Sequence, residues 1–136
     1  MSIRTEFQLM SYLKKHHKKI FPTFRDLKFN YPITGVFSGG TIGYADMFFK
    51  YRQRYFVTEI KYNENLSICN SNFWDSLKAI GYSKALSLTH TKHVSPMVMI
   101  HKSLFKKDIF PIIGKLKISY ITFEHIENKL QFEIYV

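Results

Sequence analysis

The stretch from Gly39 to Tyr62, GGTIGYADMFFKYRQRYFVTEIKY, restricts the fold of this chain more than any other. Apolar and aromatic residues dominate positions 44–50 and 55–62, which predicts two strands, and residues 51–54 between them predict a short basic turn. The first strand carries Asp46 inside its apolar run, and the second carries Glu59 and Lys61. Because a buried charge is costly unless it is compensated, these three residues need an explanation.

Hairpin geometry brings the charged residues together. A turn at residues 51–54 pairs Lys50 with Tyr55 and, four residues further along, Asp46 with Glu59, with Cα atoms about 4.5–5.5 Å apart. Lys61 follows Glu59 by two positions and projects from the same face. Two opposed carboxylates destabilise a hairpin, and a divalent cation such as Mg²⁺ or Mn²⁺ compensates them most completely.

This arrangement predicts a metal site that acts on phosphodiesters. The backbone carbonyl of Ile60 would add an oxygen ligand to Asp46 and Glu59, and Lys61 would hold or deprotonate a water molecule or steady a phosphate oxygen. Hydrolysis of a phosphodiester needs such a cation, an activated water molecule and a positive charge. The alternative is a surface charge cluster in which Lys61 bridges two acids, but the apolar neighbours of both acids favour the metal site.

The remaining pattern predicts an α/β domain with a mixed sheet flanked by helices. We expect helices at 3–20, 71–88 and, interrupted or started by Pro111, around 103–115. Further strands are expected at 26–37, with breaks at Pro32 and Gly35, and at 96–101, 117–123 and 130–136. No linker is visible in residues 1–136, so we predict a single domain.

The charge balance indicates the class of partner. The chain has 20 Lys and Arg against 10 Asp and Glu, a net charge of +10, which favours nucleic acid over a surface that is basic only for solubility. Its single cysteine, Cys69, excludes an intrachain disulfide, and no apolar run reaches the length of a membrane span. We therefore expect a cytoplasmic protein that does not bind membranes.

A family resemblance rests on the same residues. Asp46, twelve further residues and then Glu59-Ile60-Lys61 resemble the D-x(n)-E-x-K core of the PD-(D/E)XK nuclease superfamily, whose fold is restriction-endonuclease-like. The predicted α-β-β-β-α-β order over residues 3–101 is also similar. The resemblance implies a Mg²⁺- or Mn²⁺-dependent deoxyribonuclease in which Asp46 and Glu59 hold the metal and Lys61 positions or activates water.

Within that superfamily the chain looks most like the archaeal-type Holliday junction resolvases, through Glu6 in the N-terminal helix and Ser38 in the loop before Asp46. The resemblance implies that Glu6 binds the metal directly or through water and that Ser38 contacts phosphate. A homodimer is then expected, because a resolvase cuts two strands. Arg4 is the partial match to the basic residues usual near that glutamate, and Ala45 stands where many members have proline. Read without the resemblance, Glu6 either bends to solvent at the helix start or points into a site on the core side.

Other basic residues are candidates for phosphate contacts. Lys78 and Tyr82 are similar to the Q-x-x-x-Y element of RecB-like exonucleases, with Lys in place of Gln, which implies that Lys78 neutralises phosphate near the metal. The alternative is that Asp75, Lys78 and Tyr82 form a solvated helix flank. Further basic residues would grip backbone phosphates without sequence preference: Lys15, Lys18, Arg52 and Arg54.

Other functions are also open. The chain could be an exonuclease or a restriction-like nuclease, a non-cleaving nucleic-acid-binding module of the same fold, or a basic structural domain with a surface charge cluster.

Overall fold

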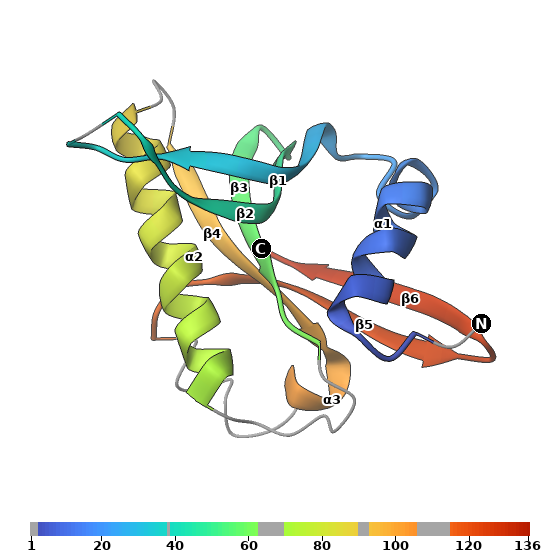
Figure 1. The fold of residues 1–136 in the computed structure, drawn as a ribbon. Coiled ribbons are helices and arrows are strands. Elements are labelled where there is room, and N and C mark those ends of the chain that lie inside the picture. The colour runs from blue at the N-terminus through green and yellow to red at the C-terminus, as the bar shows by residue number, and fades with distance from the viewer. Residues whose placement is uncertain (1–2, 38, 63–69, 90–92, 106–114) are drawn as a thin grey trace.

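A six-stranded mixed sheet with helices on both faces forms the molecule (Figure 1). The computed structural model describes residues 3–37, 39–62, 70–89, 93–105 and 115–136. In chain order its elements are α1 (Glu6–Ile20), β1 (Arg25–Thr34), β2 (Thr41–Tyr51), β3 (Arg54–Ile60), α2 (Asn70–Thr89), β4 (Val94–His101), α3 (Lys102–Phe105), β5 (Ser119–Ile126) and β6 (Lys129–Tyr135). The predicted mixed α/β architecture with flanking helices is confirmed, and the order of the predicted elements matches.

The two long helices lie on opposite faces of the sheet because side chains alternate along each strand. Leu9 and Leu13 of α1 are fully buried and pack in one cluster with Phe49 of β2. Phe48, the neighbour of Phe49, belongs instead to the cluster that contains Leu86 of α2. The helix α1 begins after Thr5, whose hydroxyl accepts a hydrogen bond from the Gln8 N–H, as expected of an N-cap.

The β2–β3 hairpin has the predicted register. Met47 pairs with Thr58, and the ladder continues to Tyr51 and Arg54 at the turn. The turn itself is shorter than the predicted residues 51–54, because it consists of Arg52 and Gln53 alone. Both adopt positive φ, 49° and 63°, the conformation that a type I′ turn requires. Tyr51 and Arg54 therefore belong to the strands.

Strand direction changes across the sheet. The strands β3, β4 and β5 are parallel neighbours, whereas β1, β2 and β6 add antiparallel edges. The crossover from β3 to β4 runs through α2, as a parallel connection requires. The predicted break at Pro32 is wrong: β1 continues through Pro32 to Thr34, because an edge strand tolerates a residue without an N–H.

Some sequence predictions fall outside the described residues. Ser38 and Cys69 lie there, as does most of the helix expected around 103–115, of which α3 is the described beginning. Within the described part of the chain, no helix is long and apolar enough to cross a membrane.

Candidate active site

The candidate site lies on the α2 face of the sheet, at the carboxyl end of β3. Phe48 and Val57 are paired and pack together beneath α2. Asp46 precedes Phe48 by two residues and Glu59 follows Val57 by two, so both carboxylates belong to this same face. The recorded pairing of β2 with β3 ends at Met47 and Thr58, one step before Asp46 and Glu59.

The Asp46 carboxylate is tied to the backbone of the neighbouring strand. Its Oδ2 atom accepts a hydrogen bond of 2.7 Å from the Ile60 N–H. This bond holds Asp46 against β3 and places it beside the peptide that follows Glu59. The orientation of the side chain is therefore fixed by the hairpin itself.

Glu59 is the most enclosed carboxylate of the site. Glu59 is only 3% exposed, and its Oε1 atom is buried without a hydrogen-bond partner. Burial, which is the larger cause, and the nearby Asp46 carboxylate together raise the pKa of Glu59 to about 9. A buried oxygen without a partner beside a second carboxylate suits a cation or a proton.

Lys61 lies between two further carboxylates. Its Nζ atom is 3.6 Å from Oε1 of Glu6 and 3.8 Å from Oδ2 of Asp75. The Tyr62 N–H also donates to Glu6 Oε1, at 3.2 Å. Glu6 therefore points toward the end of β3. This orientation agrees with the interpretation in which Glu6 points into a site on the core side, although its side chain is 45% exposed.

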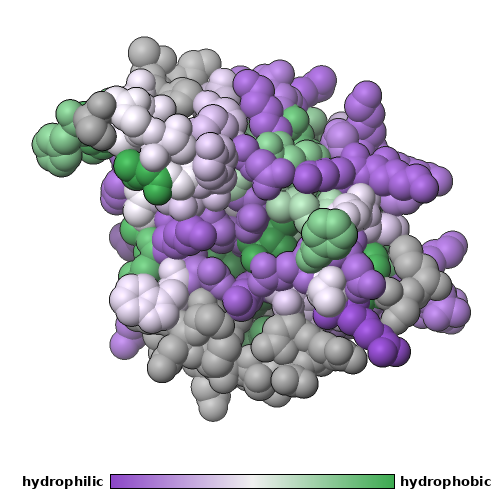
Figure 2. Space-filling view, in the orientation of Figure 1, coloured by the Kyte–Doolittle hydropathy of each residue, from purple (hydrophilic) through white to green (hydrophobic). Residues whose placement is uncertain are grey.

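The stripe on α2 faces this cluster. Burial raises the pKa of Asp75, and the charge of Glu59 is the main cause of the raised pKa of Lys78. The ammonium group of Lys78 also lies 5.8 Å from the centre of the Tyr82 ring. Asp75 and Tyr82 are partly exposed and Lys78 is exposed, so the stripe lies at the border between this cluster and solvent, and both interpretations of the stripe stay predictions. Figure 2 shows hydrophilic side chains gathered across the middle of this view, between α2 and α1.

Sequence reasoning did not identify Gly43 as part of the site. A Cβ atom added to Gly43 would overlap the Tyr82 hydroxyl and would lie 2.9 Å from its Cζ atom. Glycine at this position of β2 therefore lets α2 approach with Tyr82 pointing at the strand. The predicted strand began at residue 44, whereas β2 begins at Thr41, so Gly43 was not recognised as a glycine inside a strand, which often marks a close approach.

Several predicted phosphate contacts lie away from the carboxylates. Arg52 and Arg54 belong to the hairpin turn and the start of β3, at the opposite end of that strand from Glu59. Lys15 and Lys18 are exposed along α1, whereas Arg4 is exposed at the start of this helix, two residues before Glu6.

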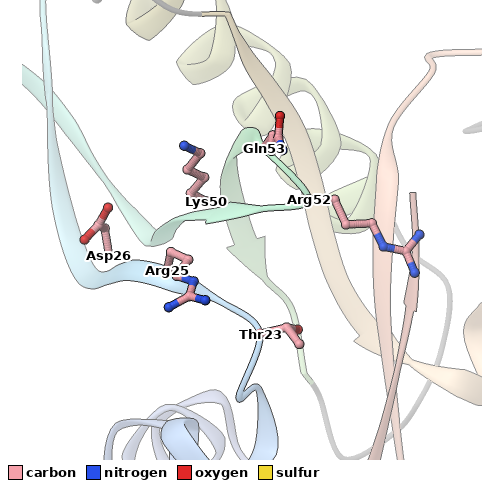
Figure 3. Close-up of a pocket in the computed structure, with 6 residues that line it drawn as sticks. All are labelled: Thr23, Arg25, Asp26, Lys50, Arg52 and Gln53. Atoms are coloured by element: carbon pink, nitrogen blue, oxygen red, sulfur yellow. The ribbon is translucent and has the colours of Figure 1, made fainter.

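A pocket of about 400 Å³ lies beside the turn, lined in part by Arg25, Asp26, Lys50 and Arg52 (Figure 3). In Figure 3 the guanidinium group of Arg52 extends away from Arg25 and Lys50. The three cations therefore do not converge on one point in this pocket.

The residues that meet can be tested against the needs of a divalent cation. Among the described residues, no group of three or more His, Cys, Asp or Glu side chains is arranged to hold a metal ion. Mg²⁺ commonly binds through only one or two carboxylates and completes its shell with water and substrate phosphates. Asp46 and Glu59, with the unpartnered Oε1 of Glu59, fit this smaller requirement.

Comparison with protein-family models, with curated proteins and with solved structures found no match for this chain.

Proposed function

We propose that the protein is a Mg²⁺- or Mn²⁺-dependent nuclease that hydrolyses phosphodiester bonds in DNA and prefers branched substrates such as four-way junctions. The observation that carries the proposal is the buried Glu59 carboxylate, with one unpartnered oxygen, beside Asp46 and two residues before Lys61. A carboxylate enclosed beside a second carboxylate is costly unless it is compensated, and a divalent cation would compensate both groups at once. The net charge of +10 independently favours a polyanionic substrate.

Each residue has a defined part in this proposal. Asp46 and Glu59, with the Ile60 carbonyl, would hold the cation, which supplies Lewis acidity and lowers the pKa of bound water. The Lys61 ammonium group is oriented by Glu6 and Asp75 and would hold the attacking water or offset charge on the phosphate. Glu6 would reach the metal through water, and Lys78 would neutralise a phosphate beside Glu59.

A cleavage panel tests the proposal. The substrates are linear duplex, single strand, flap and four-way junction, in DNA and in RNA, each with Mg²⁺ and with EDTA. We expect Mg²⁺-dependent cleavage of DNA that is fastest on the junction, with losses of at least about 100-fold in Glu59→Ala and Lys61→Ala. Cleavage that survives both substitutions, or that persists in EDTA, would contradict the proposed site.

Matched variants separate loss of chemistry from loss of charge. Glu127 and Lys129 are exposed at the β5–β6 turn, so Glu127→Ala and Lys129→Ala repeat the same charge changes far from the carboxylates. Both variants should retain wild-type rates. Rates that fall equally in the control variants would show that net charge alone determines the effect.

Metal binding distinguishes the nuclease from a basic domain with a charge cluster. Calorimetric titration with Mn²⁺ in the presence of uncleaved DNA should give heat that disappears in Asp46→Asn. A protein that binds Mn²⁺ and DNA but cuts no substrate of the panel would instead be a non-cleaving module. If the wild type and Asp46→Asn take up Mn²⁺ equally, or if neither takes it up, the proposed metal site is wrong.

Junction resolution also requires two active sites. We therefore propose a homodimer, in which two copies of Glu59 act on opposite strands. Sedimentation velocity with and without a four-way junction checks this step. A monomer on the junction would exclude coordinated resolution by two subunits, while leaving nuclease activity itself untouched.

A further inference from the structure

We propose that a second pocket, on the other flank of α2, binds a phosphate monoester such as a nucleoside monophosphate or the 5′-phosphate end of a nucleic acid. The pocket has a volume of about 320 Å³, within the range of small-molecule sites. It lies where the second half of α2, the start of β4 and the residues before β5 meet (Figure 1). Four basic side chains line it: Arg54, Lys84, His93 and Lys117.

The pocket is separate from the carboxylate site. Lys84 lies about 120° around α2 from Lys78, at about 100° per residue, and about 13 Å along the axis from Asp75. Arg54 and Glu59 stand near opposite ends of β3. A ligand in this pocket therefore need not occupy the proposed nuclease site, and the two proposals stand or fall independently.

The charge of the pocket is uncompensated. Among the described residues no carboxylate lines it, and none of the four basic side chains takes part in an ion pair. The pocket beside the hairpin turn differs, because Asp26 lines it and Arg52 points away. Four basic residues around one pocket, with no acid among its described lining residues, favour a dianionic ligand over a neutral one.

Two hydrogen-bonding groups are already oriented. The Arg54 Nη2 atom donates to Ser95 Oγ at 3.1 Å, and its guanidinium group lies 5.0 Å from the centre of the Phe56 ring. Ser95 is 5% exposed and accepts this bond, so it holds the Arg54 guanidinium group at the start of β4. The guanidinium group of Arg54 still has other N–H groups, in a geometry that suits phosphate.

The remaining wall favours an organic group on the phosphate. Ile80, Val94, Pro96 and Leu116 contribute apolar surface to the same pocket. A free inorganic phosphate would leave this surface in contact with water, whereas a sugar and base would cover it. A nucleoside monophosphate is therefore expected to bind more tightly than phosphate alone.

Equilibrium titrations of the full chain test the proposal with four probes: inorganic phosphate, adenosine, adenosine 5′-monophosphate and a short 5′-phosphorylated oligonucleotide. We expect the monophosphate to bind at least tenfold more tightly than adenosine or inorganic phosphate. Stronger binding of the phosphorylated oligonucleotide than of its unphosphorylated form would assign the site to nucleic-acid ends. If neither phosphate ester binds more tightly than adenosine, the proposal fails.

Variants assign the binding to this pocket. The double variant Lys84→Gln/Lys117→Gln keeps both aliphatic stems and removes two charges, and the control Lys19→Gln/Lys129→Gln removes two exposed charges elsewhere. The pocket variant should lose at least tenfold in affinity for the monophosphate, while the control keeps wild-type affinity. Equal losses in the pocket and control variants would overturn the proposal. Circular dichroism of each variant establishes that a loss of binding is not a loss of folding.

Discussion

At the scale of single residues, Glu59 carries the largest electrostatic cost in the described part of the chain. It is buried at the end of β3, and its partner across the hairpin, Asp46, is itself an acid. Lys61 projects beside them but contacts Glu6 and Asp75, so it does not neutralise Glu59 through an ion pair. Without a cation, protonation of Glu59 is the simplest way to relieve this cost.

The raised pKa of Glu59 predicts how stability depends on pH in EDTA. Because the folded pKa, about 9, exceeds the unfolded value of 4.5, its stabilising contribution is complete below pH 4.5 and is lost as the pH rises through 9. Between pH 7 and 9 the free energy of unfolding should fall, by at most about 1.4 kcal/mol per pH unit for one group. Urea unfolding at several pH values measures this slope.

The control for this prediction is Glu59→Gln, which keeps the shape and cannot titrate. Its slope between pH 7 and 9 should be smaller, and the variant should be more stable than the wild type at pH 9. Measurements start at pH 7 because His101, whose pKa is lowered by burial, acts with the opposite sign as the pH falls below its ordinary value of 6.5. Identical slopes for wild type and variant would contradict the environment assigned to Glu59.

Sequence reasoning reached some of these residues and not others. The period of two along a strand placed Asp46, Glu59 and Lys61 on one face, because the face of each residue in a hairpin follows from that period and from the position of the turn. The contact of Asp75 with Lys61 depends instead on how α2 rotates and how closely it approaches the sheet. Those quantities are set by packing across the whole molecule, which no local pattern specifies.

At the scale of elements, the register of β2 and β3 explains why the acids meet. A type I′ turn at Arg52 and Gln53 fixes the pairing, although neither residue is a glycine or an asparagine. The sequence predicted the register correctly while placing the turn over too many residues. A four-residue turn at 51–54 and a two-residue turn at 52–53 have the same centre and give the same residue pairs between the strands. The error in turn length therefore did not affect the prediction that Asp46 lies opposite Glu59.

The approach of α2 to β2 provides a test at the same scale. Gly43→Ala should force Tyr82 to move and lower the free energy of unfolding by roughly 1–2 kcal/mol. In a Tyr82→Ala background the same substitution should cost little, giving a coupling energy of roughly 1 kcal/mol. Urea unfolding of the four proteins of this double-mutant cycle measures the coupling.

A second glycine is a matched control for this cycle. Gly81 lies in α2, and a Cβ atom added there would meet nothing within 4 Å. Gly81→Ala should therefore stabilise the protein by up to about 1 kcal/mol, through helix propensity alone. Additive effects of Gly43→Ala and Tyr82→Ala would show that the two residues do not touch.

At the scale of the whole molecule, basic residues lie both beside the carboxylates, as Lys61 and Lys78 do, and far from them. The proposed metal site lies on the α2 face, whereas Lys15 and Lys18 lie along α1 and Arg54 lies by the second pocket. The amount of charge was predictable from composition but this distribution was not, since the distribution depends on which strands become neighbours. Contacts with a long nucleic acid are therefore expected on more than one face, with Lys78 as the predicted phosphate contact beside Glu59.

This distribution predicts the salt dependence of DNA binding. In EDTA, where no cleavage is expected, the logarithm of the binding constant should fall linearly with the logarithm of salt concentration, with a slope near −3.6 if about four phosphates are contacted. Lys78→Gln should reduce the steepness of that slope by about 0.9, because it removes one phosphate contact. Lys129→Gln, an equal change of charge at the exposed β5–β6 turn, should leave the slope unchanged.

Fluorescence anisotropy with a labelled four-way junction, measured between 50 and 200 mM salt, gives both slopes. Over this range of salt concentration the affinity changes strongly when several phosphates are contacted. Equal slopes for the two variants would mean that DNA does not approach the carboxylates along α2, and a slope near zero for the wild type would exclude phosphate recognition as the role of the basic surface.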